Sequence, residues 1–195
     1  NKNAYLSVLL LENFFFFLYL TPEEVKGYYE KLDKSLLETK SAKNIKKVLD
    51  SMTGNTLGKP APNFSAPSPE GKTISLKESL GKVTIIDFWA SWCGPCRAEN
   101  PNVVAMYNEL HDKGLNIIGV SLDKDAAKWK EAIAKDKLTW AHVSNLKFWD
   151  EPIAKQYNVQ SIPATFILDA KGNIVAKDLR GDALKAKVKE LLGVK

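Results

Sequence analysis

Apolar residues follow a helical spacing in the first part of the chain. Between residues 21 and 36 they recur at i, i+3, i+4, i+7 and i+11, on one face of a helix, as Val25, Tyr28, Tyr29, Leu32 and Leu36. Thr21-Pro22-Glu23-Glu24 predicts the start of that helix, with Thr21 as N-cap and Glu24 closing a capping box. Ser41 is predicted to cap a further helix, in which the spacing is repeated by Ile45, Val48, Leu49 and Met52.

A more continuous apolar run, from residue 4 to residue 20, precedes these helices. Its 17 residues fall short of the ~20 that a membrane-spanning helix needs, and Glu12 and Asn13 interrupt it, so we expect a buried helix. The phenylalanines from Phe14 to Phe17 wrap most of the circumference of such a helix, and one packing face cannot bury them all. We therefore expect residues 1–52 to contact a second surface, either a partner chain or an N-terminal domain absent from this sequence.

The pattern changes after residue 52. The stretch TGNTLGKPAPNFSAPSPEGK, residues 53–72, is rich in Gly and Pro and predicts a linker into a new unit that starts near Leu57. The expected domains are a helical N-terminal segment with its linker, 1–56, and a second domain, 57–195.

Strands and helices alternate in the second domain. VTIIDFWA (83–90) is nearly continuous in apolar residues, as in a strand buried on both faces, and 115–123 predicts another strand. Helices are expected at 94–113, 125–137 and 151–158. ATFILD and NIVAKDLR flank Ala170-Lys171-Gly172, which predicts a hairpin, and Asp182 is expected to cap a last helix ending at Leu192. This order predicts an α/β fold, a mixed sheet with helices on both faces.

Charge and cysteine content narrow the function. The 28 basic and 23 acidic residues give a net charge of +5, but no basic stripe is interleaved with aromatics, so no nucleic-acid partner is expected. The only two cysteines, Cys93 and Cys96, lie in FWASWCGPCRAENP. A disulfide that closes so short a loop stabilises the folded protein by only about 2 kcal/mol. A zinc site would need two more ligands, for which only His111, His142 and carboxylates are available. We therefore expect redox chemistry, with no metal and no cofactor.

The spacing of the two cysteines suits that chemistry. Residues three apart on a helix share one face, close enough to bridge. The preceding strand delivers Cys93 to the helix N-terminus, which favours a thiolate, so Cys93 is expected to be the exposed nucleophile and Cys96 the buried thiol that resolves the mixed disulfide. Pro95, after Gly94, stiffens the turn, and Trp92 is expected to cover one side of the thiol.

DFWASWCGPC closely resembles the thioredoxin family, and three further stretches resemble its TlpA/ResA branch of bacterial envelope proteins: GKPAPNFSAPSPEGKTISLKESLGK, CRAENP and IPATFILDAKGNIV. The resemblance spans about residues 57 to 193 and implies a thioredoxin-like fold preceded by the helical segment. It makes Cys93 the nucleophile and Cys96 the resolving thiol. Pro163, after Ile162, matches the cis-proline that docks substrate backbone, Pro101 matches the proline that kinks the active-site helix, and Asp87 matches the buried acid beneath the disulfide.

Two acids are candidate proton acceptors. Asp87 lies inside Ile-Ile-Asp-Phe-Trp, where burial would raise its pKa towards neutrality. Glu99, three residues after Cys96, is the rival, although a first-turn glutamate can simply face water beside the helix dipole.

The resemblance implies a thiol–disulfide oxidoreductase that reduces protein disulfides in the periplasm or cell envelope, supplied by an upstream thiol electron donor and membrane-anchored in a longer protein. Two alternatives stay open. A peroxiredoxin-like peroxidase would need Pro-x-x-x-Thr-x-x-Cys, but Ile86 and Ala90 occupy the proline and threonine positions. A partner-binding module with idle cysteines would lack thiol activity altogether.

Overall fold

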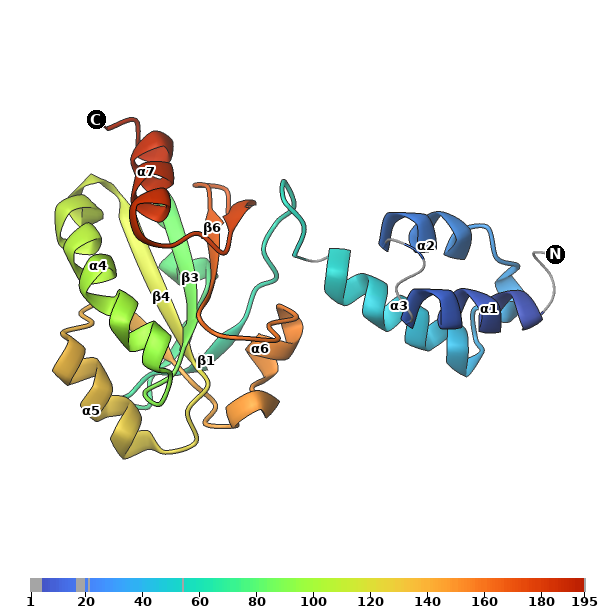
Figure 1. Cartoon of the computed structure of the whole chain (residues 1–195), viewed down its shortest axis with the longest axis horizontal. Coiled ribbons are helices and arrows are strands. Elements are labelled where there is room, and N and C mark those ends of the chain that lie inside the picture. The colour runs from blue at the N-terminus through green and yellow to red at the C-terminus, as the bar shows by residue number, and fades with distance from the viewer. Residues whose placement is uncertain (1–4, 17–19, 21, 54, 195) are drawn as a thin grey trace. The chain divides into compact units, whose positions relative to one another are not determined.

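The computed structural model describes residues 5–16, 20, 22–53 and 55–194, which divide into two compact units, Asn1–Gly54 and Asn55–Lys195 (Figure 1). The division falls between residues 54 and 55, whereas the sequence placed the domain boundary at 56/57. Each unit has its own cluster of buried apolar side chains.

The first unit is helical, as predicted. It contains α1 (Tyr5–Phe16), α2 (Pro22–Tyr29), a 3-10 turn (Lys34–Leu36) and α3 (Lys40–Thr53). All of these elements contribute to a small core of Val8, Leu11, Phe15, Val25, Leu36, Ala42, Ile45 and Leu49. None of the helices in the described part of the chain is both long and apolar enough to cross a membrane.

Two local predictions in this unit are wrong. The single helix expected through Leu36 ends at Tyr29, because Asp33 accepts the Ser35 N–H at 3.0 Å and starts a separate 3-10 turn that returns Leu36 to the core. Thr39 caps α3 in place of Ser41, because its Oγ1 accepts the Ala42 N–H at 3.3 Å. The N-cap expected at Thr21 lies outside the described residues.

The second unit is built on a mixed sheet of order β5-β4-β3-β6-β7, which confirms the predicted fold class. The strands β3 (Val83–Trp89), β4 (Leu115–Ser121) and β5 (Ala141–Val143) are parallel, and β6 (Ala164–Leu168) and β7 (Ile174–Lys177) run antiparallel to their neighbours. A separate hairpin pairs β1 (Ser65–Pro67) with β2 (Thr73–Ser75).

Helices cover both faces of this sheet. Figure 1 shows α4 (Gly94–Leu110), α5 (Ala126–Asp136) and α7 (Gly181–Leu192) on one face and α6 (Pro152–Gln156) on the other. Short 3-10 turns occupy Lys77–Ser79, His111–Lys113 and Phe148–Asp150. Every residue of β3 is buried, because β3 is paired on both sides and covered on both faces. The strand thus fixes the position of the loop that follows it.

The cap of the last helix differs from the prediction. The N-cap of α7 is Arg180, whose side chain makes no capping bond, and Asp182 lies inside the first turn. Instead, the Glu99 carboxylate of α4 accepts the Gly181 N–H at 2.7 Å. A side chain that is distant in sequence can satisfy a helix N-terminus as well as a local one, which a local pattern does not reveal.

Candidate active site

The two cysteines form a disulfide at the N-terminus of α4. Cys93 is the N-cap and Cys96 lies one turn into the helix, with their Cα atoms 5.3 Å apart. The Cys96 N–H donates to Cys93 Sγ at 3.2 Å. A backbone donor aimed at this sulfur would also stabilise a thiolate, as would the positive end of the helix dipole.

Cys93 is less accessible than expected. In this oxidised form it is 5% exposed and Cys96 2%, so the expectation of an exposed nucleophile is wrong here. Cys93 Sγ is bonded to the sulfur of Cys96, which lies in the first turn of α4. The intervening Gly94 and Pro95 are exposed and present the site to solvent.

A buried carboxylate holds the loop that precedes the cysteines. Asp123, just after β4, is 1% exposed and accepts the Ser91 N–H at 2.9 Å and the Ser91 hydroxyl at 2.6 Å. The Ser121 hydroxyl donates to the same carboxylate at 2.7 Å. Ser91 is two residues before Cys93, so these bonds fix the path of the chain into the disulfide.

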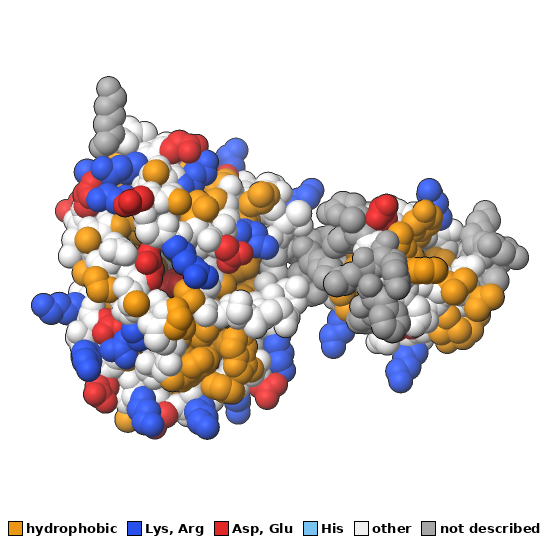
Figure 2. Space-filling view, in the orientation of Figure 1, with side chains coloured by type: hydrophobic (Ala, Val, Ile, Leu, Met, Phe, Trp, Pro, Cys, Tyr) orange, Lys and Arg blue, Asp and Glu red, His pale blue; other side chains and the backbone are white. Residues whose placement is uncertain are grey.

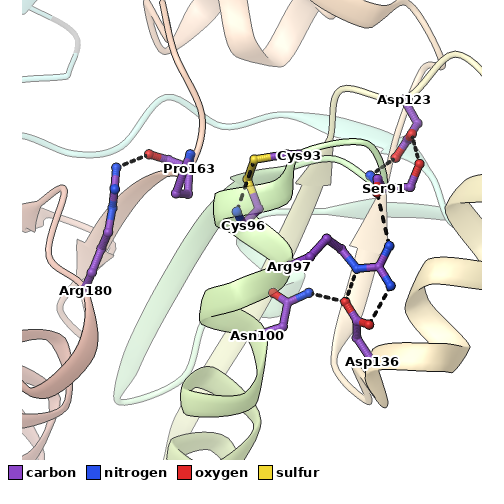
Figure 3. The surroundings of a disulfide bond; sticks show 9 residues. All are labelled: Ser91, Cys93, Cys96, Arg97, Asn100, Asp123, Asp136, Pro163 and Arg180. Carbon is purple, nitrogen blue, oxygen red and sulfur yellow. Dashed lines mark hydrogen bonds and ion pairs between the residues drawn. A yellow bond between two sulfur atoms is a disulfide. The ribbon is translucent and has the colours of Figure 1, made fainter.

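A second set of bonds ties the loop to the neighbouring helix. Arg97 donates to the Ser91 carbonyl at 3.1 Å and makes a two-pronged ion pair with Asp136 of α5. Asn100 Nδ2 also donates to Asp136, at 2.6 Å. Figure 3 shows this network on one side of the disulfide. A bidentate arginine–carboxylate pair fixes orientation as well as distance, so α4 and α5 are held together beside the cysteines.

Proline and arginine lie on the other side of the disulfide (Figure 3). The Ile162–Pro163 peptide bond is cis, as the resemblance implies. Arg180 donates to the Pro163 carbonyl at 2.7 Å and so connects this turn to the start of α7. Pro163 is buried and Ile162 is half-buried.

Asp87 lies in the central strand beneath the cysteines. A cavity of about 20 Å³ is lined by Asp87 and Cys96, with Glu99, Pro163 and Arg180 also in its wall. Such a space is large enough for about one water molecule. Burial raises the pKa of Asp87 to about 7, the negative charge of Glu99 adds to the rise, and Arg180 opposes it.

The Glu99 carboxylate forms a hydrogen bond with the N-terminus of helix α7. One carboxylate oxygen accepts the Gly181 N–H and the other accepts from Asn102 Nδ2 at 3.2 Å. It therefore stabilises the N-terminus of α7, rather than only that of its own helix. Its charge reaches Asp87 through space.

Trp92 packs against two further aromatic residues, Phe148 and Trp149. Its ring centroid lies 5.1 Å from that of Phe148 and 6.3 Å from that of Trp149. Sequence reasoning missed Phe148 and Trp149, whose signal is a pair of adjacent aromatics in a polar loop. It also missed Ser91, Arg97, Asp123 and Arg180.

Within the described residues, no group of three or more His, Cys, Asp or Glu side chains is arranged to hold a metal ion.

A Cys-x-x-Cys disulfide on the helix that follows the central strand defines a thioredoxin-like thiol–disulfide oxidoreductase. Residues 57–177 match the AhpC/TSA family, and the chain belongs to that family, as a thioredoxin-like oxidoreductase of the TlpA/ResA type. The peroxidase motif is incomplete, because Ile86 and Ala90 stand where it needs proline and threonine.

Named relatives agree with this class. The thiol-disulfide oxidoreductase ResA of Bacillus thuringiensis is 31% identical over 136 residues, 70% of this chain and 76% of the relative. The thioredoxin-like protein YneN of Bacillus subtilis is 35% identical, over 60% of this chain and 68% of its own. The crystal structure of the thioredoxin domain of a Bacteroides vulgatus thiol-disulfide oxidoreductase matches with a TM-score of 0.66 at 36% identity, covering 70% of this chain and 98% of that one.

Proposed function

We propose that this thiol–disulfide oxidoreductase reduces disulfides of protein substrates, with Cys93 as the attacking thiolate and Cys96 as the resolving thiol. The observation that carries the proposal is the disulfide at the N-terminus of α4 above a buried acid. An attacking thiolate gains from the helix N-terminus, and Cys93, as N-cap, has the better position.

The reaction starts from the reduced protein. The Cys93 thiolate attacks one substrate sulfur, the substrate disulfide breaks, and the other substrate sulfur leaves as a thiolate. Cys96 then loses its proton and attacks Cys93 Sγ, which forms the intramolecular disulfide and releases the second substrate thiol. The substrate gains two electrons and the protein loses two. An upstream dithiol donor restores the reduced pair by the reverse exchange.

Asp87 is proposed to accept the proton of Cys96. Both residues line the same small cavity, and a carboxyl group with a pKa of about 7 is partly ionised at neutral pH. The cis-proline turn at Ile162 and Pro163, together with Trp92, Gly94 and Pro95, is proposed to contact the substrate chain. Glu99 is proposed to act on the proton transfer only through its charge.

The direction of electron flow and the compartment are also proposals. The Gly-Pro dipeptide between the cysteines is that of thioredoxin, a reductant with a potential of about −270 mV, and this supports reduction. Similarity to the TlpA/ResA branch supports the cell envelope. For residues 1–52 we propose contact with a further domain or partner chain, because α1 exposes Leu6 by 63%, Leu10 by 47% and Phe14 by 46% while burying Phe15. Phe17 and the side chain of Phe16 lie outside the described part.

Trapping of mixed disulfides tests the roles of the two cysteines. Cys96→Ser should accumulate covalent complexes with substrate proteins in cells, because the resolving attack is lost, whereas Cys93→Ser should not. Equal trapping by both variants, or trapping by neither, would contradict the assignment. Insulin reduction by the wild type, together with a measured redox potential, tests the direction.

A further inference from the structure

Three aromatic rings form an exposed surface directly beside the active site. We call Trp92, Phe148 and Trp149 the aromatic platform; they are 46%, 39% and 38% exposed. Phe148 and Trp149 lie 6.2 Å apart between ring centroids, and both lie against Trp92, the residue that precedes Cys93. Figure 2 shows a concentration of hydrophobic side chains where α4 begins and the chain leads into α6.

The backbone beneath the platform is strained. Phe148 has φ +54° and Leu146 has φ +57°, in the left-handed region that glycine adopts freely and a bulky side chain does not. The ring is nevertheless not fully covered, because 39% of Phe148 stays exposed to solvent. Strain that holds an apolar ring in water beside a reactive group indicates a binding role.

Charge around the platform is predominantly positive. Lys124 Nζ lies 5.9 Å from the centre of the Phe148 ring, and Lys147 is exposed directly before it. A depression beside Trp92 is lined by Lys128 and Lys135, with Glu131 as its acidic member. The nearby acids Asp136 and Asp150 are already paired with Arg97 and Lys155. The rim therefore complements acidic side chains.

We propose that the aromatic platform binds a large apolar side chain of an extended, acidic substrate segment while Cys93 attacks a cysteine of that segment. This inference rests on the proposed function and specifies its substrate class. An extended chain advances about 3.3 Å per residue, so a side chain that reaches Phe148 across Trp92 belongs about two to four residues from the attacked cysteine. Aromatic rings offer a large contact area and have few rotatable bonds, so they can bind an apolar side chain on an open surface without a deep pocket.

Matched peptides test the proposal. Each is acidic, carries one cysteine as a mixed disulfide with thionitrobenzoate, and has leucine or serine three residues from that cysteine. Reduced wild-type protein should prefer the leucine peptide by about tenfold in kcat/KM, as expected for partial burial of one aliphatic side chain. In Phe148→Gly and in Trp149→Ser this preference should disappear, whereas Leu57→Ser, which removes an apolar residue 58% exposed elsewhere, should keep it.

The ratio between the two peptides separates docking from an indirect effect. If Phe148→Gly slowed both peptides equally, the ring would act through the disulfide and the proposal would be overturned. Glycine relieves the strained backbone but also removes the ring contacts with Trp92 and Trp149. The urea unfolding midpoint of each variant is therefore measured, and the peptide ratio is compared under conditions in which every variant is folded. Replacing both Lys124 and Lys147 by Glu should weaken reaction with either peptide, and Lys171→Glu should not.

Failure of the proposed function would be seen separately. If no peptide were reduced, the oxidised protein would be titrated with the leucine peptide in which serine replaces cysteine, and binding would be followed by tryptophan fluorescence. Binding that is lost in Phe148→Gly would support the platform without the reductase. Equal binding by Phe148→Gly and the wild type would overturn it.

Discussion

Asp87 combines burial with a position in the same cavity as Cys96. Its pKa of about 7 means that a modest change in pH switches it between proton acceptor and proton donor. The active-site motif FWASWCGPCRAENP contains no histidine. This is a further reason for the proposal that Asp87 accepts the proton of Cys96.

Asp87→Asn should therefore slow resolution of the mixed disulfide by about 100-fold, the usual contribution of a positioned base. The wild-type rate should rise with pH through about 7, and this rise should be lost in the variant. Alkylation of Cys93 should barely change, because its thiolate depends on the helix N-terminus. Stopped-flow measurement of substrate release and a separate alkylation assay would check both points.

Glu99→Gln is the matched control for this prediction. It removes the charge that helps to raise the pKa of Asp87, so the pH profile should move to lower pH while resolution persists. If Glu99→Gln abolished fast resolution and Asp87→Asn did not, Glu99 would be the acid and the role given to Asp87 would be wrong.

The same raised pKa affects stability. The folded-state pKa of Asp87 lies above its ordinary value of 3.8, so the stability of the native state falls as pH rises from about 3.8 to 7. Above pH 7 the cost is on the order of 4 kcal/mol at most. Asp87→Asn should therefore make the oxidised protein as stable or more stable at pH 8 and give no gain at pH 3.5, as measured by urea unfolding.

The loop between β3 and α4 is held in place by Asp123, the residue that lies just after β4. Asp123→Ala would leave the Ser91 N–H and two hydroxyls without their buried acceptor, which costs about 3 kcal/mol. It should also slow thiol exchange, because the chain entering Cys93 loses its anchor. Denaturant unfolding and the rate of insulin reduction would measure the two effects.

Asp169→Ala provides the comparison. That carboxylate likewise accepts three bonds, from the Lys171 N–H and from the N–H and Nδ2 of Asn173, but in the turn before β7. Its loss should lower stability and leave the rate of exchange intact. Equal slowing by both variants would show that Asp123 acts only through general stability.

Long, strongly patterned elements were predictable from sequence. The buried run of β3, the hairpin of β6 and β7, and the helices α4, α5 and α7 follow from apolar periodicity and turn residues, and the structure confirms them. The short strand β5 was missed because its pairing with β4 depends on tertiary position, not on length or pattern. The break after Tyr29 was missed because both parts of the segment return apolar residues to one core.

The residues of the candidate site also fall into those that the sequence predicted and those that it did not. Cys93 and Cys96 follow from spacing alone, and Asp87 stands out as an acid inside an apolar strand. Pro163 needed the family resemblance to be singled out. The network of Ser91, Arg97, Asp123 and Asp136 joins residues 32 and 39 positions apart, and no local rule connects them. Such contacts become visible only when the sheet brings β4 and α5 beside the cysteines.

The stability of the whole second unit should depend on His142. This side chain is 3% exposed and packs between Trp89 and Trp140, with ring centroids 5.4 and 5.7 Å away. Burial lowers the pKa of His142 from 6.5 to about 3. The unfolded chain therefore binds an extra proton between these values, and stability falls as pH decreases from 6.5 to 3.

His142→Phe should remove that dependence. Relative to the variant, the wild type should lose up to about 5 kcal/mol of unfolding free energy between pH 6.5 and 3. Trp140→Phe disturbs the same packing without removing a titrating group, so it should keep the wild-type slope. Urea unfolding at several pH values would compare the slopes; the same slope in His142→Phe and the wild type would contradict the prediction. Asp87 works in the opposite direction from pH 3.8 to 7 in all three proteins.

The parallel strands β3, β4 and β5 place their carboxyl ends at one edge of the sheet, where Ser91 and Asp123 meet the cysteines. Leu168, at the end of β6, pairs with Thr84 near the start of β3, so the turn at 169–173 lies at the opposite edge. That turn is consequently a suitable place for an affinity tag or a surface linkage. An enzyme immobilised there would present its disulfide away from the support, where large protein substrates can approach it.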